Sequence, residues 1–395
     1  MYKRLIRFNH NHNLFLFGPR GVEKSTLLKN NFKKEESYWI DLLDPEIEGE
    51  YSREPGQLLS IVRGLHSEIK YVIIDEVQKI PKLLDAVHKL IEETDKVFIL
   101  TGSSARKLKY GCANLLAGRA FVYHLYPFSC FELGNHFDLQ QALEWGTLPK
   151  IFTLSEPETK RAFLRSYSDT YLKEEVWNEH LIRKLEPFRR FLEVAAQCNG
   201  KIINVSNIAK DVGVDSKTVK EYFSILEDTL LGFFLEPFHS SFRKRLSKSP
   251  KFYFIDSGIV RSLSRMLSVS LIPKTSAYGE TFEHFILLEF FKLNSYFQQD
   301  YRFSYLMTQE DVEIDLVVER PEKKLLCVEI KSTDHIKESD ISSFIKITRD
   351  LNEINKCEAI VLSQDTDVKK YDHVTCYHWK DGLAKCFPEV QQCNV

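Results

Sequence analysis

A short loop near the amino terminus constrains the fold of this chain more than any other feature. Residues 14–17 (Leu-Phe-Leu-Phe) have the length and apolarity of a buried strand, and residues 18–26 (Gly-Pro-Arg-Gly-Val-Glu-Lys-Ser-Thr) follow directly. Such a loop between a strand and a helix can surround phosphate with backbone N–H groups at the amino terminus of the helix. The pattern predicts a nucleotide-binding P-loop in an α/β domain.

Two later apolar runs indicate a parallel sheet. Residues 71–74 (Tyr-Val-Ile-Ile) and 97–100 (Val-Phe-Ile-Leu) have strand length, and residues 81–93 between them carry apolar side chains at helical spacing. Buried strands that alternate with helices are typical of βαβ units. We expect a nucleotide-binding domain over residues 1–150, with ATP and Mg²⁺ as its cofactors.

The loop residues have distinct expected roles. Lys24 would reach the β- and γ-phosphates, and the Ser25 hydroxyl would ligate Mg²⁺. Glu23, however, stands where the pattern Gly-x4-Gly-Lys-[Ser/Thr] requires a second glycine. Its bulk and charge should weaken nucleotide binding or distort the loop unless the side chain points to solvent. The expected cofactor-binding residues of the loop are Gly18, Pro19, Arg20, Gly21, Lys24, Ser25 and Thr26.

Polar residues after the two later runs complete the expected nucleotide site. Asp75 would hold Mg²⁺ through water, and Glu76 would polarise the attacking water. Ser103 lies where a γ-phosphate sensor is expected, and Arg119 is a candidate for neutralising charge on a neighbouring subunit's nucleotide. Alternatively, Asp75 and Glu76 form only a solvated turn, and Arg119 forms an ordinary ion pair.

The middle of the chain, residues 151–270, is mainly helical. Residues 204–213 and 214–223 are typical of a helix–turn–helix, and runs of strand length follow at 232–235 and 251–255. This order predicts a winged helix whose aromatic residues pack in the core. Its basic surface could contact the phosphates of DNA, although such a module could equally bind protein or act as a lid. The candidate nucleic-acid contacts are Lys217, Lys220, Arg243, Lys244, Arg245 and Lys248.

The last part of the chain returns to an α/β pattern, with strand-like residues at 312–318 and 325–330. Asp315 lies on the first strand, and Glu329 and Lys331 lie at the end of the second. A hairpin would bring Asp315 beside Glu329, and alternation puts Glu329 and Lys331 on one face. Two adjacent carboxylates bind a divalent metal, and a nearby lysine can position water against a phosphodiester. The alternative is an ion pair on a solvated hairpin.

Several short motifs follow one another along the chain, and they begin at Gly18, Asp75, Thr101, Leu116, Tyr126, Gly146, Tyr253 and Gly279. Together they resemble prokaryotic AAA-type P-loop ATPases that carry a carboxy-terminal domain of unknown function. The resemblance implies an AAA domain, a winged helix and, over residues 271–395, a restriction-endonuclease-like fold. It covers nearly the whole chain and departs from the family most clearly at Glu23.

The last domain is also similar to the PD-(D/E)xK nucleases through its Asp…Glu-x-Lys pattern. Such folds often supply an additional acidic residue from the preceding helix, and Glu283 is similar to it. Gln309 and Glu310 are further candidates for contact with the metal. The leading hypothesis is an ATP-controlled, metal-dependent nuclease in DNA processing or defence. The alternatives are a non-catalytic DNA- or protein-binding scaffold, and a nuclease whose ATPase module serves only for oligomerisation.

Composition narrows the function classes further. Lys and Arg number 54 against 56 Asp and Glu, a formal net charge of −2, which excludes a globally basic DNA-coating protein. No apolar run reaches the ~18 residues of a membrane span, and the amino terminus lacks the apolar core of a signal peptide. The eight cysteines form no Cys-x-x-Cys pair, as expected for a reduced cytoplasmic protein. DNA is the expected partner, and a homo-oligomer is a further possibility.

Overall fold

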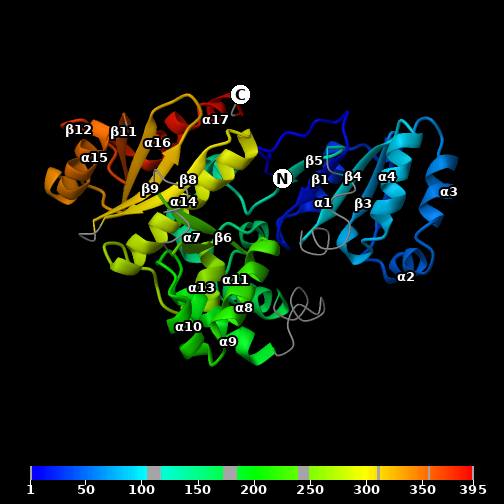
Figure 1. The fold of residues 1–395 in the computed structure, drawn as a ribbon, viewed down its shortest axis with the longest axis horizontal. Coiled ribbons are helices and arrows are strands. Elements are labelled where there is room, and N and C mark those ends of the chain that lie inside the picture. Colours follow the sequence, from blue (N-terminus) through cyan, green and yellow to red (C-terminus); the bar gives the residue numbers. More distant parts are fainter. Residues whose placement is uncertain are drawn as a thin grey trace.

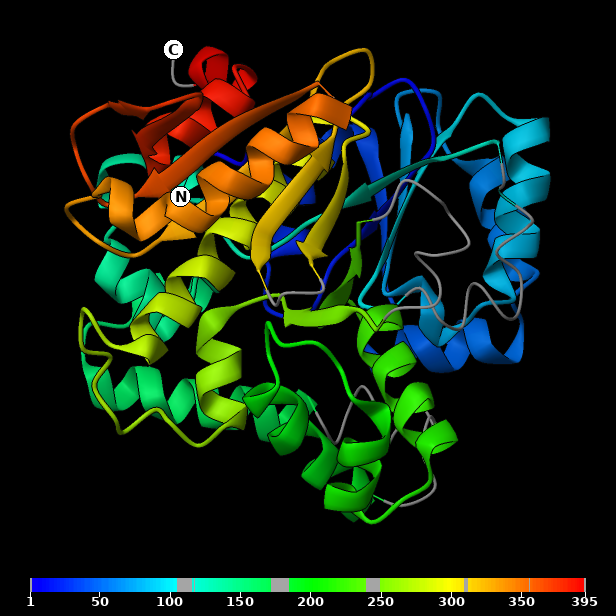
Figure 2. The ribbon, with the colours of Figure 1, turned by 60° about the vertical axis from the view of Figure 1, so that its left-hand side comes forward.

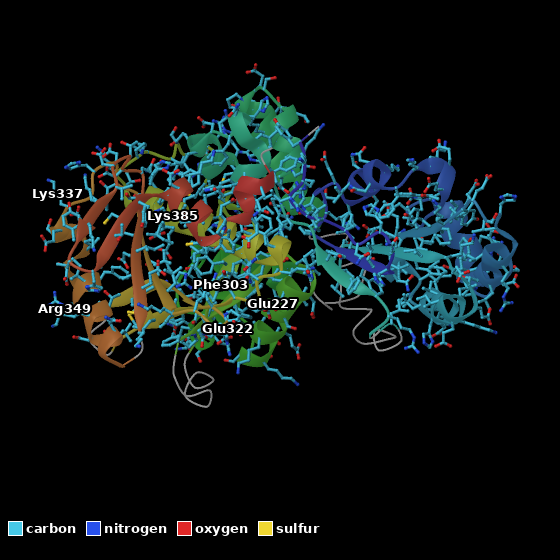
Figure 3. The ribbon with its side chains drawn as sticks, turned by 90° about the horizontal axis from the view of Figure 1, so that it is seen from above. Glu227, Phe303, Glu322, Lys337, Arg349 and Lys385 are labelled. Atoms are coloured by element: carbon cyan, nitrogen blue, oxygen red, sulfur yellow. The ribbon has the colours of Figure 1, made fainter. Side chains whose placement is uncertain are left out.

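The computed structural model describes residues 2–104, 116, 118–171, 185–238, 249–308, 312–354 and 356–393. Figure 1 shows three parts: a five-stranded sheet with its helices, a group of middle helices, and a carboxy-terminal part built on an eight-stranded sheet. Seen from above in Figure 3, Lys337 and Arg349 lie at the end of the molecule that is farthest from the five-stranded sheet. None of the described helices is both long and apolar enough to cross a membrane.

The amino-terminal sheet has the strand order β2-β3-β4-β1-β5, and every neighbouring pair is parallel. This confirms the predicted parallel sheet. Because the strands are parallel, their carboxyl ends share one edge, and the loop after β1 opens at that edge. The strands are β1 (Leu14–Phe17), β2 (Ser37–Asp41), β3 (Tyr71–Asp75), β4 (Val97–Gly102) and β5 (Phe121–His124). The helices are α1 (Lys24–Asn31), α2 (Pro45–Arg53), α3 (Gln57–Gly64) and α4 (Leu83–Glu93).

The middle part is helical and contains the predicted helix–turn–helix. Asn204 caps α10, Gly213 ends it with a φ of 77°, and Asp215 caps α11. The strands β6 and β7 follow as an antiparallel hairpin. The elements are α6 (Cys130–Leu133), α7 (Leu139–Trp145), α8 (Pro157–Tyr171), α9 (Leu185–Gln197), α10 (Val205–Val212), α11 (Ser216–Asp228), β6 (Gly232–Pro237), β7 (Lys251–Phe254) and α13 (Ser257–Leu263).

The carboxy-terminal sheet is mixed and has the order β12-β13-β11-β10-β9-β8-β6-β7. The hairpin joins it because Glu236 and Pro237 of β6 pair in parallel with Ser304 and Tyr305 of β8. The predicted domain boundary at residue 270 therefore falls between strands of one sheet. The strands are β8 (Arg302–Met307), β9 (Glu313–Glu319), β10 (Leu325–Lys331), β11 (Cys357–Ser363), β12 (Lys369–Tyr371) and β13 (Val374–His378).

Helices cover both faces of this sheet. Phe344 of α15 packs with Val361 on one face, and α15 lies across the strands in Figure 2. On the other face, Phe285 of α14 and Trp379 of α16 pack with Leu362. The helices are α14 (Ser276–Phe297), α15 (Ser342–Ile354), α16 (Trp379–Cys386) and α17 (Glu389–Cys393).

The helix α14 also joins the carboxy-terminal part to the segment that follows β5. Glu289 and Lys292 lie on this helix with exposed fractions of 0% and 1%. Lys292 Nζ donates to the Phe128 carbonyl (2.9 Å) and to Glu289 Oε1 (3.0 Å), and Ser129 Oγ donates to Glu289 Oε2 (2.6 Å). Because buried charges are costly to separate, this network fixes α14 against the end of the amino-terminal domain.

Candidate functional site

The P-loop lies at the carboxyl edge of the parallel sheet, between β1 and α1. Gly18 N donates to the Gly102 carbonyl (3.2 Å), and a Cβ at Gly18 would lie 2.4 Å from the Leu125 carbonyl oxygen. Gly21 has a φ of +76°. The backbone therefore requires glycine at both positions, once for close approach and once for a left-handed conformation.

Glu23 adopts the conformation that a glycine would take. It has φ 68° and ψ 39° at the amino terminus of α1, and its side chain is exposed. A left-handed conformation costs a residue with a Cβ about 1–2 kcal/mol. Glu23 also helps to line a pocket of about 630 Å³ between α1 and the amino-terminal segment. The Glu23 side chain is therefore exposed to solvent. This is the condition under which we expected the P-loop to keep room for phosphate.

Lys24 and Ser25 point toward the carboxylates that end β3. Lys24 is 6% exposed, and its Nζ donates to the Gly18 carbonyl (2.8 Å) and lies 3.5 Å from Glu76 Oε1. Ser25 Oγ donates to Asp75 Oδ2 (2.5 Å). The loop and the end of β3 therefore form one site, with the four predicted side chains in contact.

The remaining loop residues contact the middle helices and the pocket. The Pro19 carbonyl accepts from Lys24 Nζ (3.4 Å), and the Arg20 carbonyl accepts from Tyr167 Oη (3.0 Å) on α8. Thr26 lines the same pocket as the exposed glutamate at the start of α1. The P-loop is thus in direct contact with α8, a contact that no sequence pattern predicts.

Two residues to which no role was assigned hold the carboxylates in place. Thr101 Oγ1 donates to Asp75 and accepts from the Glu76 N–H (3.0 Å). Gln78 Nε2 and Ser103 Oγ both donate to Glu76 Oε2, the second at 3.0 Å. The predicted sensor Ser103 is therefore beside Glu76. The signal for Thr101 is its place at the end of β4, next to the end of β3.

Asp75, the last residue of β3, and Glu76, which follows it, have opposite pKa shifts. Burial raises the pKa of Asp75, and hydrogen bonds from two hydroxyl groups only partly offset this effect. Burial also acts to raise the pKa of Glu76, but Lys24 and hydrogen bonds from neighbouring side chains outweigh it, so this pKa is lowered. Glu76 is therefore a carboxylate at neutral pH, as an acceptor that orients water must be.

Arg119 lies away from the P-loop of its own chain. It precedes β5 at the amino-terminal edge of the sheet, where Asn13 donates to its carbonyl oxygen (3.1 Å). Its Nη2 pairs with Glu92 Oε1 (2.9 Å). Because the P-loop opens at the opposite edge, Arg119 cannot contribute to this nucleotide site within one chain. A role toward a neighbouring subunit stays a prediction.

A second cluster forms where β9 and β10 pair. The two strands are antiparallel, and their register brings Asp315 next to Glu329. Ile330 N donates to Asp315 Oδ2 (2.7 Å), and Lys331 Nζ lies 2.6 Å from Glu329 Oε1. The hairpin thus brings together the three residues of the predicted Asp…Glu-x-Lys pattern.

Further charged residues reach the same cluster from α14, β7 and β9. Tyr253 Oη donates to Glu283 Oε1 (3.0 Å), and Lys251 Nζ lies 3.8 Å from that oxygen. Lys251 also pairs with Glu313. Glu283 was predicted here, whereas Lys251 and Tyr253 belong to the strand-length run 251–255 and were not predicted at this site. The sequence offers no signal for them, because β7 reaches α14 only through long-range pairing of the sheet.

The closely spaced carboxylates change one another's protonation. Burial and the neighbouring Asp315 raise the pKa of Glu283 to about 8 and that of Glu329 to about 8. Burial alone would lower the pKa of Lys331, but Glu329 and Asp315 outweigh it and raise that pKa. Buried carboxylates with strongly raised pKa values are typical of acid–base and metal sites.

Asp315 and Glu329 are suited to hold a divalent metal. Glu329 is 7% exposed, and its buried Oε2 has no hydrogen-bond partner among the described residues. In the described ranges, no group of three or more His, Cys, Asp or Glu side chains is arranged to coordinate a metal ion. Mg²⁺, however, usually binds proteins through one or two carboxylates and completes its shell with water and phosphate. The residues present therefore fit such an ion.

The predicted nucleic-acid contacts are described only in part. Lys217 and Lys220 are exposed on α11, the second helix of the helix–turn–helix. The aromatic residues of the hairpin pack in the core as predicted: Phe233, for example, stacks on Phe291 with ring centroids 4.0 Å apart. The other predicted contacts, Arg243, Lys244, Arg245 and Lys248, and the candidate metal contacts Gln309 and Glu310 lie outside the described residues.

Three domain families match consecutive segments of the chain. Residues 10–134 match the AAA domain, residues 136–270 a domain of unknown function (DUF8612), and residues 278–381 another domain of unknown function (DUF4143). The amino-terminal part is thus an AAA-type ATPase domain, a class that binds ATP and Mg²⁺. The two other families bring no function with them.

Relatives of the chain are themselves uncharacterized. A protein of Mycobacterium tuberculosis is 26% identical over 308 residues, which cover 78% of this chain and 67% of that protein. A protein of Methanocaldococcus jannaschii is 22% identical over 366 residues, which cover 86% of this chain and 79% of that protein. No activity can be transferred from either.

Solved structures resemble the chain only distantly. The Drosophila ORC structure, bound to AT-rich DNA and Cdc6, has a TM-score of 0.22 at 10% identity and covers 65% of this chain and 86% of that chain. Can2 from Sulfobacillus thermosulfidooxidans, in complex with cyclic tetra-adenylate, has a TM-score of 0.21 at 11% identity, with 96% and 99% covered.

Proposed function

We propose that this protein is an ATP-controlled, metal-dependent nuclease. Its AAA domain would bind Mg²⁺ and ATP at the P-loop, and its carboxy-terminal cluster would hydrolyse phosphodiester bonds of DNA. The observation that carries the proposal is the convergence of Asp315, Glu329, Lys331 and Glu283 in one partly buried cluster. Structural ion pairs alone do not require three acidic groups so close together that their pKa values rise.

The cluster supplies the groups that phosphodiester hydrolysis needs. A divalent ion held by Asp315 and Glu329 would polarise the phosphate and an attacking water. Lys331 has a raised pKa and is therefore an ammonium group at neutral pH. As such it would orient water and balance the charge that develops on the phosphate, rather than remove a proton. Glu283 lies within the same field of charge and would accept hydrogen bonds from that water.

The helix α14 supports the proposed link between nucleotide and nuclease. Glu283 lies in its first half, and Glu289 and Lys292 lie further along the same helix. The second pair contacts the segment directly after β5 of the AAA domain. A rigid helix that carries a cluster residue and is held by the ATPase domain can transmit a movement of that domain to the cluster.

The Lys331→Ala variant tests the nuclease. We expect Mg²⁺- or Mn²⁺-dependent cleavage of linear duplex and single-stranded DNA by the unaltered chain, and a loss of about 100-fold or more in the variant with DNA binding retained. Lys323→Ala is the matched control, because this exposed lysine lies in the turn of the same hairpin. Equal cleavage by Lys331→Ala and the control would remove the active-site assignment. DNA binding without cleavage by any form would favour the scaffold alternative.

A further inference from the structure

Lys251 is a second lysine in the carboxylate cluster, and it comes from a different element than Lys331. The acidic residues of this cluster are Glu283, Glu313, Asp315 and Glu329. It is the first residue of β7 and is 4% exposed. Its Nζ pairs with Glu313, lies 3.8 Å from Glu283 Oε1, and lies 5.4 Å from the centre of the Tyr305 ring. A lysine this deeply buried must be balanced by the acidic groups around it.

The position of Lys251 is fixed by its backbone. It pairs with Leu235 of β6 on one side and forms a bridge to Ile202, next to the helix–turn–helix, on the other. Tyr305 lies under its side chain and donates its hydroxyl to the Ser249 carbonyl (2.6 Å). Strand pairing and packing therefore hold the ammonium group at the cluster, whereas the ammonium group of a surface lysine would be flexible.

The two lysines divide the cluster into two halves. Lys331 pairs with Glu329 next to Asp315, and Lys251 pairs with Glu283 and Glu313. Four acidic groups thus face two ammonium groups, and a bound divalent ion would stabilise the ionised form of the carboxylates that hold it. The unpartnered Glu329 Oε2 belongs to the first half, so the free ligand capacity is on a carboxylate that Lys251 does not pair with.

We propose that Lys251 is a positioning residue that takes the place of a second metal ion, so that the cluster binds a single divalent cation through Asp315 and Glu329. This inference rests on the proposed metal-dependent function. An ammonium group between Glu283 and Glu313 repels a further cation and keeps both carboxylates occupied. With the lysine charge removed, these two carboxylates would be free to bind a second ion.

Counting bound Mn²⁺ in the nucleotide-free, full-length protein by electron paramagnetic resonance tests this inference. The Asp315→Asn variant serves as the reference that lacks the cluster site, so that ions bound elsewhere are subtracted. We expect one cluster ion in the unaltered chain and in Lys251→Arg, which keeps the cation. In Lys251→Met we expect a second ion and the signal of two coupled Mn²⁺ ions. Lys251→Gln is the alternative neutral variant, since its amide can still donate to Glu313 if the methionine variant does not fold.

The outcomes separate this inference from the function on which it rests. One ion in both the unaltered chain and the neutral variants would overturn the role of Lys251 and leave the metal site standing. Two ions in the unaltered chain would overturn it as well. No cluster ion in any form would overturn the metal site itself, and with it the proposed nuclease.

Discussion

Glu23 shows how a single residue can keep the shape of a motif while changing its charge. The residue takes the left-handed conformation of the missing glycine, and its carboxylate is exposed beside the P-loop. The strain raises the free energy of the folded loop by about 1–2 kcal/mol, and the carboxylate repels a bound triphosphate. Because the side chain is exposed and does not block the P-loop, we expect Glu23 to weaken nucleotide binding without abolishing it.

We therefore expect the unaltered protein to bind Mg-ATP and the Glu23→Gly variant to bind it about five- to tenfold more tightly, which corresponds to about 1 kcal/mol. Calorimetric titration measures both affinities. The Glu23→Gln variant separates the two causes, because it removes the charge and keeps the Cβ. Binding by Glu23→Gly alone would mean that the natural loop is silenced, and equal affinities in all three forms would mean that neither charge nor strain matters.

Charged residues from separate elements meet in the carboxylate cluster. Because they shift the pKa values of one another, the stability of the folded protein should depend on pH. The pKa of Glu329 is raised to about 8 from an ordinary value of 4.5, so the folded protein holds this proton more tightly than the unfolded chain. The stabilisation is therefore complete below about pH 4.5 and is lost as the pH rises toward about 8. We expect the melting temperature of the metal-free protein to fall over this range, and to fall less in Glu329→Gln, which cannot ionise there. Parallel curves for the two forms would contradict the assignment.

The same elements show what the sequence could and could not predict. Three of the five parallel strands (β1, β3 and β4), the P-loop and the contact between Asp315 and Glu329 were predictable, because each depends on neighbouring residues and on a short turn. Lys251 was not predicted in the cluster because its place there depends on the pairing of β6 with β8, strands that are far apart in sequence. The position of Arg119 at the opposite edge of the sheet depends likewise on where β5 joins it. Patterns of apolar residues specify strands, but not which distant strands will pair.

In the whole molecule, α14 contacts both the carboxylate cluster and the segment that follows β5 of the AAA domain. Glu283 contributes to the cluster, and near the other end of the helix Tyr296 Oη accepts from the Tyr126 N–H (3.1 Å), directly after β5. Between them lies the buried Glu289–Lys292 pair. A movement of the AAA domain on nucleotide binding would therefore act on the helix at two places and reach Glu283 through its rigid backbone.

The Tyr296→Phe variant tests this coupling without touching either site. It leaves the buried Tyr126 N–H without its partner, so we expect a loss of about 1–3 kcal/mol in stability. Because the carboxylate cluster is unaltered, the proposed DNA cleavage without nucleotide should stay as in the natural chain. The change in cleavage rate caused by ATP should shrink about fivefold, as expected when a contact carries about 1 kcal/mol of coupling. Tyr301→Phe is the control, since Tyr301 lies beside the end of the same helix and forms its hydrogen bonds with Asn294 through its backbone. An ATP response that is equal in both variants and the natural chain would show that the nucleotide signal does not pass through α14.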